Sequence, residues 1–194
     1  PYGSRSPAEI LEFMQQILQF MAAQNIKMAV IACNTMTALG LDIARRQYPF
    51  MVVGVNTGVR AALKVSHNRN IGVIATQATI ASGKHGKALK SANPNVRIYP
   101  QACPKFVSLI EQEQLSGPVI EEAAREYLTP LKEAQVDTLI LGCTHYPFIG
   151  GLINRLMGPG VTLINPARET AMDARLALVK AGRLSRQGRP GTAR

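Results

Sequence analysis

Short apolar runs recur along the chain and alternate with stretches in which apolar residues have helical spacing. A continuous apolar run of about 4–8 residues is typical of a strand that is covered on both faces. The runs predict strands at 28–32, 51–55, 71–75, 96–99, 138–141 and 161–164. We expect the first of these, Met28 to Ala32, to be buried on both faces.

The intervening stretches predict helices. Ser6-Pro7-Ala8-Glu9 has the form of a capping box with proline in the first turn, so a helix begins there. Its apolar face would carry Ile10, Met14, Ile17, Leu18 and Met21. Further helices are predicted at 36–47, 59–65, 79–92, 106–113, 118–134, 148–157 and 167–181.

Strands that alternate with helices indicate βαβ units, and therefore an α/β fold with mostly parallel sheets. In such sheets, ligands bind beyond the carboxyl ends of the strands, where loops lead into helix N-termini. The residues that directly follow each apolar run are therefore the first candidates for a functional site.

Composition limits the class of protein. The 194 residues are 46% hydrophobic, enough for a real core, and no apolar run approaches the roughly 20 residues of a membrane span. Cys33, Cys103 and Cys143 are too few and too widely spaced for a disulfide framework, so we expect reduced thiols and a cytoplasmic protein. The chain opens on Pro1-Tyr2-Gly3 without an initiator Met, so we expect it to be trimmed or incomplete.

The net charge of +10 is concentrated toward the C-terminus. From Arg168 onward, seven Lys or Arg residues stand against Glu169 and Asp173, which gives half of that charge. We interpret 182–194 as a solvated, flexible basic tail rather than a nucleic-acid arm, because no aromatic residues are interleaved with the cations. A basic tail that docks on an acidic partner would make the chain a non-catalytic binding module, which is an alternative reading.

Two cysteines occupy matched positions. Cys33 follows the first predicted strand in Val-Ile-Ala-Cys-Asn-Thr, and Cys143 follows the fifth in Ile-Leu-Gly-Cys-Thr-His. Each segment reads as strand, small residue, Cys and two polar residues before a helix, as expected for two related lobes that face each other. The helix dipole and free N–H groups at such a terminus would lower the pKa of a thiol and hold a ligand carboxylate.

Two such thiols on opposite sides of one ligand could remove a proton from one face of a carbon and return one to the other face. That reaction inverts a stereocentre, and the sequence offers neither a pyridoxal-lysine context nor a glycine-rich phosphate loop, so we expect no cofactor. Two inert cysteines, or a zinc site formed by Cys33, Cys143 and His145, are the alternatives, although Cys-x-x-Cys spacing is lacking. Cys103 lacks a comparable strand-to-helix setting and is expected to be structural.

The strings PYG, ACNT and GCTHYP and the segment 103–111, in this order, resemble the glutamate racemase family of the aspartate/glutamate racemase superfamily. The resemblance covers nearly the whole chain. It implies that Cys33 acts as acid/base on D-glutamate and Cys143 on L-glutamate, with His145 assisting Cys143 and Glu111 supporting it. The implied substrate-binding residues are Tyr2, Gly3, Asn34, Thr35, Thr144 and His145.

The resemblance also implies two α/β lobes with the ligand between them, mapped here to 1–55 with 165–194 and to 56–164. The implied function is an isomerase that makes D-glutamate for peptidoglycan, without metal or cofactor; an aspartate or broad-specificity racemase is the alternative within the class. A homodimer is left open, and no membrane or nucleic-acid partner is expected.

The sequence departs from the family pattern at three places. The family has a strand and an Asp-Ser-Gly-x-Gly-Gly loop before PYG, and that Asp is expected to assist the thiol matched by Cys33. Segment 55–58 stands where the family has Ile-Glu-Pro-Gly, and Asn165-Pro166 stands where it has Asp-Ser. If the family's first strand is interior, a polypeptide that begins at Pro1 should have loose packing around 1–55 and 165–194 and little racemase activity.

Overall fold

The computed structural model describes residue 2 and residues 5–185. Within them, six strands form two parallel sheets. One pairs β1 (Met28–Ile31) with β2 (Met51–Gly54). The other has the order β4-β3-β5-β6 and consists of β3 (Asn70–Ala75), β4 (Arg97–Ala102), β5 (Thr138–Leu141) and β6 (Thr162–Ile164). This confirms the predicted α/β class, and all six strands lie where the apolar runs predicted them.

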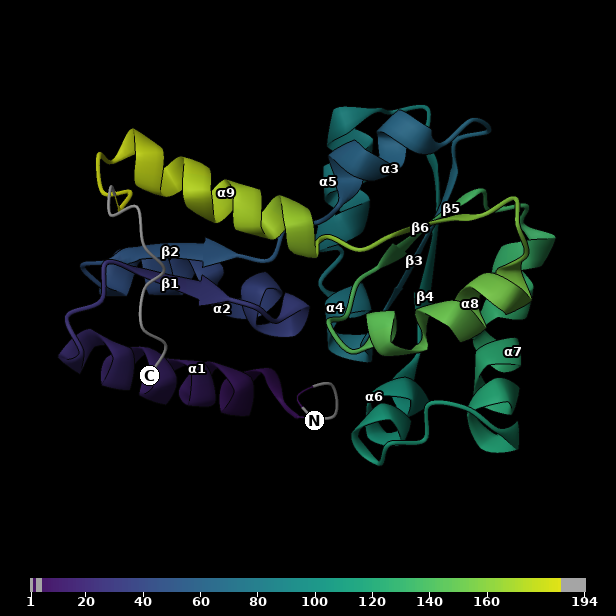
Figure 1. Cartoon of the computed structure of the whole chain (residues 1–194), viewed down its shortest axis with the longest axis horizontal. Coiled ribbons are helices and arrows are strands. Elements are labelled where there is room, and N and C mark those ends of the chain that lie inside the picture. Colours follow the sequence, from purple (N-terminus) through teal and green to yellow (C-terminus); the bar gives the residue numbers. More distant parts are fainter. Residues whose placement is uncertain (1, 3–4, 186–194) are drawn as a thin grey trace.

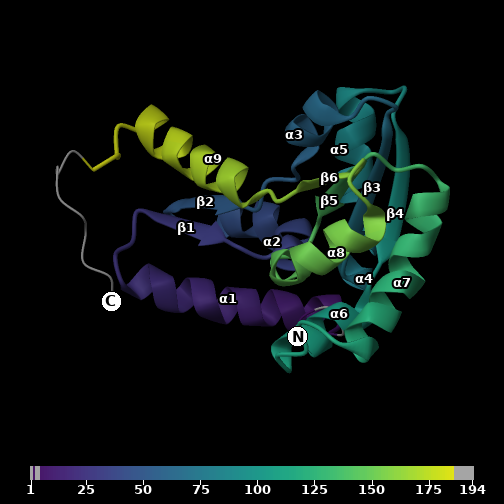
Figure 2. The ribbon, with the colours of Figure 1, turned by 45° about the vertical axis from the view of Figure 1, so that its right-hand side comes forward.

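Helices cover both sheets (Figures 1 and 2). α1 (Pro7–Ala23) and α2 (Asn34–Gln47) pack with the two-stranded sheet, and α9 (Ala167–Lys180) contacts β2. α3 (Val59–Val65), α4 (Gln77–Ala81) and α5 (Lys84–Ala92) follow β2 and β3. α6 (Pro104–Glu111), α7 (Pro118–Glu133), the 3-10 helix η2 (Tyr146–Ile149) and α8 (Gly150–Met157) complete the second group. The division into lobes of 1–55 with 165–194 and of 56–164 stays a prediction.

The first helix begins as the capping box predicted. The Ser6 hydroxyl accepts a hydrogen bond from the Glu9 amide at 3.3 Å, and the Glu9 carboxylate accepts one from the Ser6 amide at 2.9 Å. Ile10, Met14 and Leu18 on the inner face are buried. A cap of this kind typically stabilises a helix by about 1 kcal/mol, so the start of α1 is set locally.

Alternation along the central strands divides the core of the four-stranded sheet into two layers. Ile74, Leu139 and Leu141 face α6, α7 and α8, whereas Ile71, Val73 and Ile140 face α3 and α5. All six side chains are nearly inaccessible to solvent. Both faces of β3 and β5 are therefore covered, as expected for interior strands of a parallel sheet.

Two sequence expectations about these elements are wrong. The helix expected over 79–92 is divided into α4 and α5, because Gly83 has a φ of +65° and ends the first segment. β1 is not buried on both faces either: Val30 is 44% exposed. Ala29 and Ile31 face the core with α1 and α2, whereas Val30 lines a cavity beneath α9.

Asn56 connects the end of the two-stranded sheet to α9. Its side-chain amide donates to the Asp173 carboxylate at 2.6 Å, and its backbone amide donates to the Thr170 hydroxyl at 3.0 Å. Its side-chain oxygen accepts a hydrogen bond from the Gly58 amide at 2.8 Å, just before α3. Segment 55–58 therefore ties α9 to the β2–α3 connection.

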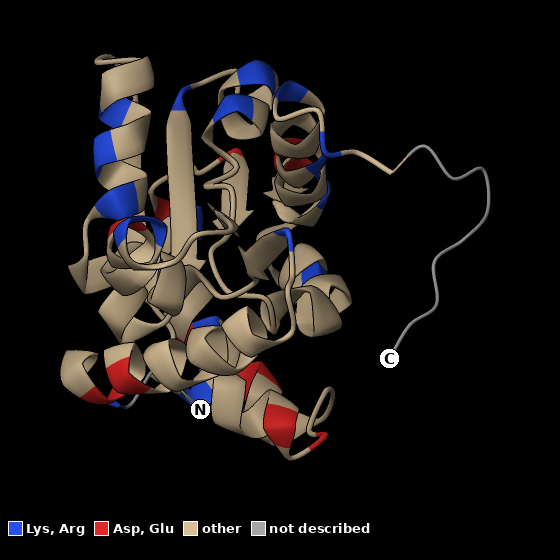
Figure 3. Ribbon diagram, turned by 90° about the vertical axis from the view of Figure 1, so that its left-hand side faces the viewer, with Lys and Arg blue, Asp and Glu red and all other residues tan. Residues whose placement is uncertain are grey.

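Charge is also segregated on the folded body (Figure 3). No Asp or Glu occurs between Asp42 and Glu111, although this stretch contains ten Lys or Arg residues. Those residues lie on the end of α2, on α3, α5 and α6, on β4 and in a connecting loop. The positive charge is thus not confined to the C-terminal segment, of which 186–194 lies outside the described residues.

Candidate active site

Cys33 lies at the junction between β1 and α2. It is the N-cap residue of α2, with an extended backbone (φ −141°, ψ 123°), and its side chain makes no capping hydrogen bond. The thiol belongs to a half-buried residue, whereas Asn34 and Thr35 behind it are buried. The first N–H groups of α2 lack intrahelical partners, so this end of the helix favours an anion.

Cys143 follows β5 and Gly142 and leads into helices, as predicted, but the thiol is not itself at a helix N-terminus as expected. A turn comes first, in which the Cys143 carbonyl accepts a hydrogen bond from the Tyr146 amide at 3.2 Å, and η2 then precedes α8. Only 8% of Cys143 is exposed. Burial raises the pKa of the Cys143 thiol to about 11, and hydrogen bonds from the His145 and Tyr146 amides only partly oppose this. The lowered pKa expected for this thiol is therefore also wrong.

The two cysteines line one cavity of about 140 Å³. It is bounded by Tyr2, Ala32, Cys33, Asn34, Thr35, Thr76, Val107, Gly142, Cys143, Thr144 and His145. The residues that follow β1, β3 and β5 meet here, at the carboxyl ends of the strands. Of the predicted site residues, Glu111 does not line the cavity and Gly3 lies outside the described residues.

Glu111 instead reaches the site through His145. Nδ1 of His145 lies 3.7 Å from Sγ of Cys143, and Nε2 lies 2.6 Å from Oε1 of Glu111. The carboxylate fixes the ring tautomer, because a proton on Nε2 can be donated to Glu111 and leaves Nδ1 free to accept. The arrangement Cys143–His145–Glu111 can therefore take a proton from the thiol.

Three threonine hydroxyls form a hydrogen-bonded ring beside the cavity, and two of them, Thr35 and Thr76, belong to its lining. Thr35 Oγ1 lies 3.0 Å from Thr76 Oγ1 and 3.1 Å from Thr79 Oγ1, and Thr76 and Thr79 are 3.0 Å apart. All three residues are buried. The sequence analysis missed Thr76, although it follows β3 as Cys33 follows β1, and the same positional rule would have found it.

Cys103 also lies at a strand-to-helix junction, contrary to expectation. It is the N-cap residue of α6, directly after β4. Its side chain has no exposed surface, and burial strongly raises the pKa of its thiol. A matched strand–Cys–helix setting is therefore insufficient by itself to mark a reactive thiol, and exposure to the cavity distinguishes Cys33 and Cys143 from Cys103.

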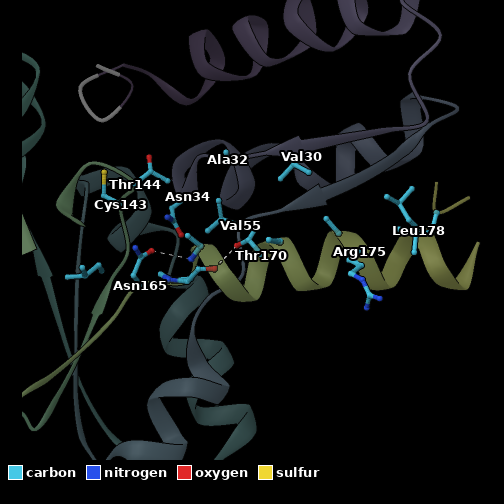
Figure 4. Close-up of a pocket in the computed structure, with 16 residues that line it drawn as sticks. Val30, Ala32, Asn34, Val55, Cys143, Thr144, Asn165, Thr170, Arg175 and Leu178 are labelled. Carbon is cyan, nitrogen blue, oxygen red and sulfur yellow. Dashed lines mark hydrogen bonds between the residues drawn. The ribbon is translucent and has the colours of Figure 1, made fainter. Parts of the chain in front are cut away.

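A second cavity of about 530 Å³ adjoins the first, between β1 and α9 (Figure 4). Asn34, Cys143 and Thr144 lie at its end next to the first cavity, and Val30, Val55 and Leu178 make its walls apolar. Arg175 is the charged residue among its lining. The Cys143 side of the site is thus continuous with an apolar space under α9.

Among residues 2 and 5–185, no cluster of three or more His, Cys, Asp or Glu side chains is arranged to hold a metal ion. Within the same part of the chain, no helix combines the length and apolar character that crossing a bilayer would require.

Comparisons with known proteins give a consistent family. Residues 1–174 match the family model for Asp/Glu/hydantoin racemases. A glutamate racemase of Lactiplantibacillus plantarum is 46% identical over 179 residues, which are 92% of this chain and 66% of the relative. The chain thus spans about two thirds of the length of that relative, and 57% of a glutamate racemase of Trichormus variabilis.

Solved structures agree with the sequence match. A glutamate racemase isoform of Bacillus anthracis superimposes with a TM-score of 0.89 at 35% identity, covering 96% of this chain and 70% of that one. A glutamate racemase of Francisella tularensis, solved in complex with D-glutamate, gives 0.88 at 35% identity and covers 98% and 71%.

Proposed function

The chain belongs to the Asp/Glu/hydantoin racemase family, and from this premise we propose that its protein interconverts L- and D-glutamate with two cysteines and no cofactor. The observation that carries the proposal is that Cys33 and Cys143, from junctions after different sheets, line one small cavity. Relatives named glutamate racemase support glutamate as the substrate.

In the proposed reaction, the Cys33 thiolate removes the α-proton of D-glutamate. The Cys143 thiol donates its proton to the opposite face of the same carbon, which gives L-glutamate and leaves Cys143 as the thiolate. The reverse direction exchanges these roles, so one thiol and one thiolate are needed at the start of each turnover.

His145 and Glu111 are proposed to make Cys143 a usable base. Burial favours the neutral thiol of Cys143, so its thiolate needs a nearby positive charge or a proton acceptor. Nδ1 of His145 is close enough to accept the proton, and the Glu111 carboxylate would stabilise the imidazolium that forms. Catalysis on the Cys143 side would depend on this pair.

The substrate carboxylates would be bound by N–H groups and hydroxyls of the cavity. The first turn of α2, which starts at Asn34 and Thr35, offers free N–H donors, and Thr144 and Tyr2 bound the same space. A supply of D-glutamate for peptidoglycan and a cytoplasmic location, where thiols stay reduced, go with this proposal.

Circular dichroism of L- or D-glutamate incubated with the gene-encoded protein tests the proposal. The circular dichroism signal should decay to zero from either enantiomer, also in the presence of EDTA or hydroxylamine. Cys33→Ser and Cys143→Ser should each abolish the decay, because a hydroxyl is a much weaker acid than a thiol. Cys103→Ser should retain most of the activity. Turnover of aspartate in place of glutamate would refute the substrate, and an active Cys33→Ser variant would refute the two-thiol mechanism.

A further inference from the structure

Three side-chain hydrogen bonds join the first turn of α2 to residues 76–84, which run from the N-cap of α4 to the first residue of α5. Two are the contacts of Thr35 with Thr76 and Thr79. The third runs from the Lys84 ammonium to the Thr37 carbonyl, over 3.2 Å. All three reach residues that lie within four positions of Cys33, the N-cap of the same helix.

Thr37 is the point at which this turn is fixed to its own sheet. Its hydroxyl donates to the Ile31 carbonyl at the end of β1 and accepts from the Val55 amide after β2, both at 3.1 Å. A displacement of Thr37 would therefore also shift the ends of both strands and the turn that carries Cys33. Lys84 donates its hydrogen bond to the carbonyl of this same residue, Thr37.

Lys84 is held along α2 rather than extended into solvent. It is half-buried, and burial lowers the pKa of its ammonium, an effect that Asp42 opposes and Arg45 reinforces. A hydrogen bond from a charged donor in such surroundings is stronger than a neutral one. Lys84 therefore contacts α2 more firmly than an exposed lysine would.

The neighbouring residue, His85, lies near the glycine that precedes the other cysteine. His85 is buried, and a Cβ atom built on Gly142 would lie 3.6 Å from Cε1 of its ring. Gly142 directly precedes Cys143. The first two residues of α5 thus lie beside both cysteine-bearing segments: Lys84 donates to the first turn of α2, and His85 lies near Gly142.

We propose that Lys84 is a positioning residue that sets the separation of Cys33 from Cys143 by holding the first turn of α2 against α5. Lys84 does not line the cavity, so it acts through Thr37 and not on the substrate. The inference rests on the proposed two-thiol reaction. Misplacing one base relative to the substrate carbon lowers the rate of its proton transfer far more than it weakens binding.

Lys84→Met tests this in the gene-encoded protein, with Lys87→Met as the matched control, because Lys87 is exposed on the same helix. We expect Lys84→Met to lower kcat about tenfold with KM changed less than about twofold. Lys84→Arg, which can donate to the same carbonyl, should restore kcat to within about threefold of wild type. Lys87→Met should match wild type.

The isotope effect separates positioning from loss of folded protein. With α-deuterated substrates, Lys84→Met should raise the effect on D-glutamate, whose proton Cys33 removes, more than the effect on L-glutamate. A variant that is merely less stable would leave both ratios unchanged. Equal effects in Lys84→Met and wild type, or an equal loss in Lys87→Met, would overturn the proposal.

A second readout does not depend on racemisation. A short bifunctional alkylating reagent should link Cys33 to Cys143 in wild type, with a lower yield in Lys84→Met and an unchanged yield in Lys87→Met. If wild type fails to racemise glutamate, the proposed function fails and this cross-link alone decides the role of Lys84. An unchanged cross-link yield in Lys84→Met would overturn that role even in an active enzyme.

Discussion

Nδ1 of His145 lies 3.7 Å from Sγ of Cys143, a thiol that burial makes a weak acid. The histidine comes from the same turn, two residues along, and is held on its far side by Glu111 of α6. A base at this distance can offset the burial of the thiol without exposing it to water.

His145→Gln should therefore lower kcat for glutamate racemisation about 100-fold, because Cys143 loses its proton acceptor. The remaining activity should increase with pH beyond the range in which wild type is maximal, since no neighbouring base would then accept the proton of the thiol during the reaction. Glu111→Gln keeps a hydrogen-bonding group and should cost about tenfold. The pH dependence of kcat for the three proteins checks this; a wild-type profile in His145→Gln would exclude the proposed relay.

Alkylation should distinguish the thiols. With a pKa of about 11, Cys143 should react with iodoacetamide about tenfold faster for each unit of pH from 7 to 10, because its thiolate is the nucleophile. Cys103, which is fully buried, should stay unmodified until the protein unfolds. Peptide mass spectrometry of a Cys33→Ser variant, in which Cys33 cannot compete, measures both rates. A rate for Cys143 that is already constant above pH 8 would contradict the raised pKa.

Local rules predicted much of the fold, because each depends on residues close in sequence. The Ser6–Glu9 capping box and all six apolar runs specified elements that the structure contains. Gly83 is a local signal as well: its positive φ separates α4 from α5 and places Lys84 and His85 at the start of a helix. A prediction of one continuous helix over 79–92 could therefore not show that Lys84 and His85 stand at a helix start.

What the sequence could not provide was environment. The segments around Cys33, Cys103 and Cys143 all join a strand to a turn or helix, and only packing decides which thiols reach a cavity. The dipole argument for Cys143 failed because a turn separates it from the helices, and because burial outweighs the backbone hydrogen bonds from His145 and Tyr146. Val30 likewise belongs to an apolar run, yet it lines a cavity because of where α9 lies.

Gly142 should not tolerate a side chain. A Cβ atom there would lie 2.9 Å from the Ile74 carbonyl oxygen and 3.0 Å from the Ala75 Cβ, both on the central strand β3. Gly142→Ala should lower the free energy of unfolding by about 1–3 kcal/mol. It should also move Cys143, so kcat should fall even for protein that remains folded. Gly151→Ala is the control, because nothing lies within 4 Å of its added Cβ in α8. It should stabilise by up to about 1 kcal/mol in urea unfolding.

His85 gives the fold a specific sensitivity to acid. Its ring is buried, and neither ring nitrogen has a hydrogen-bond partner among the described residues. Burial, reinforced by the charge of Lys84, lowers the pKa of His85 from 6.5 to about 4. The folded protein therefore keeps this imidazole neutral over a pH range in which the unfolded chain protonates it.

Because the unfolded state binds the additional proton, the free energy of unfolding should decrease as pH falls from about 6.5 to about 4 and should lose nothing further from this group below pH 4. A shift of this size corresponds to about 3 kcal/mol. Urea unfolding of wild type and His85→Phe at pH 7, 5.5 and 4 isolates the effect, because all other groups titrate in both proteins. The variant should become relatively more stable by about that amount at pH 4. Parallel pH dependences for the two proteins would mean that His85 is protonated, or bonded to water, in the folded state.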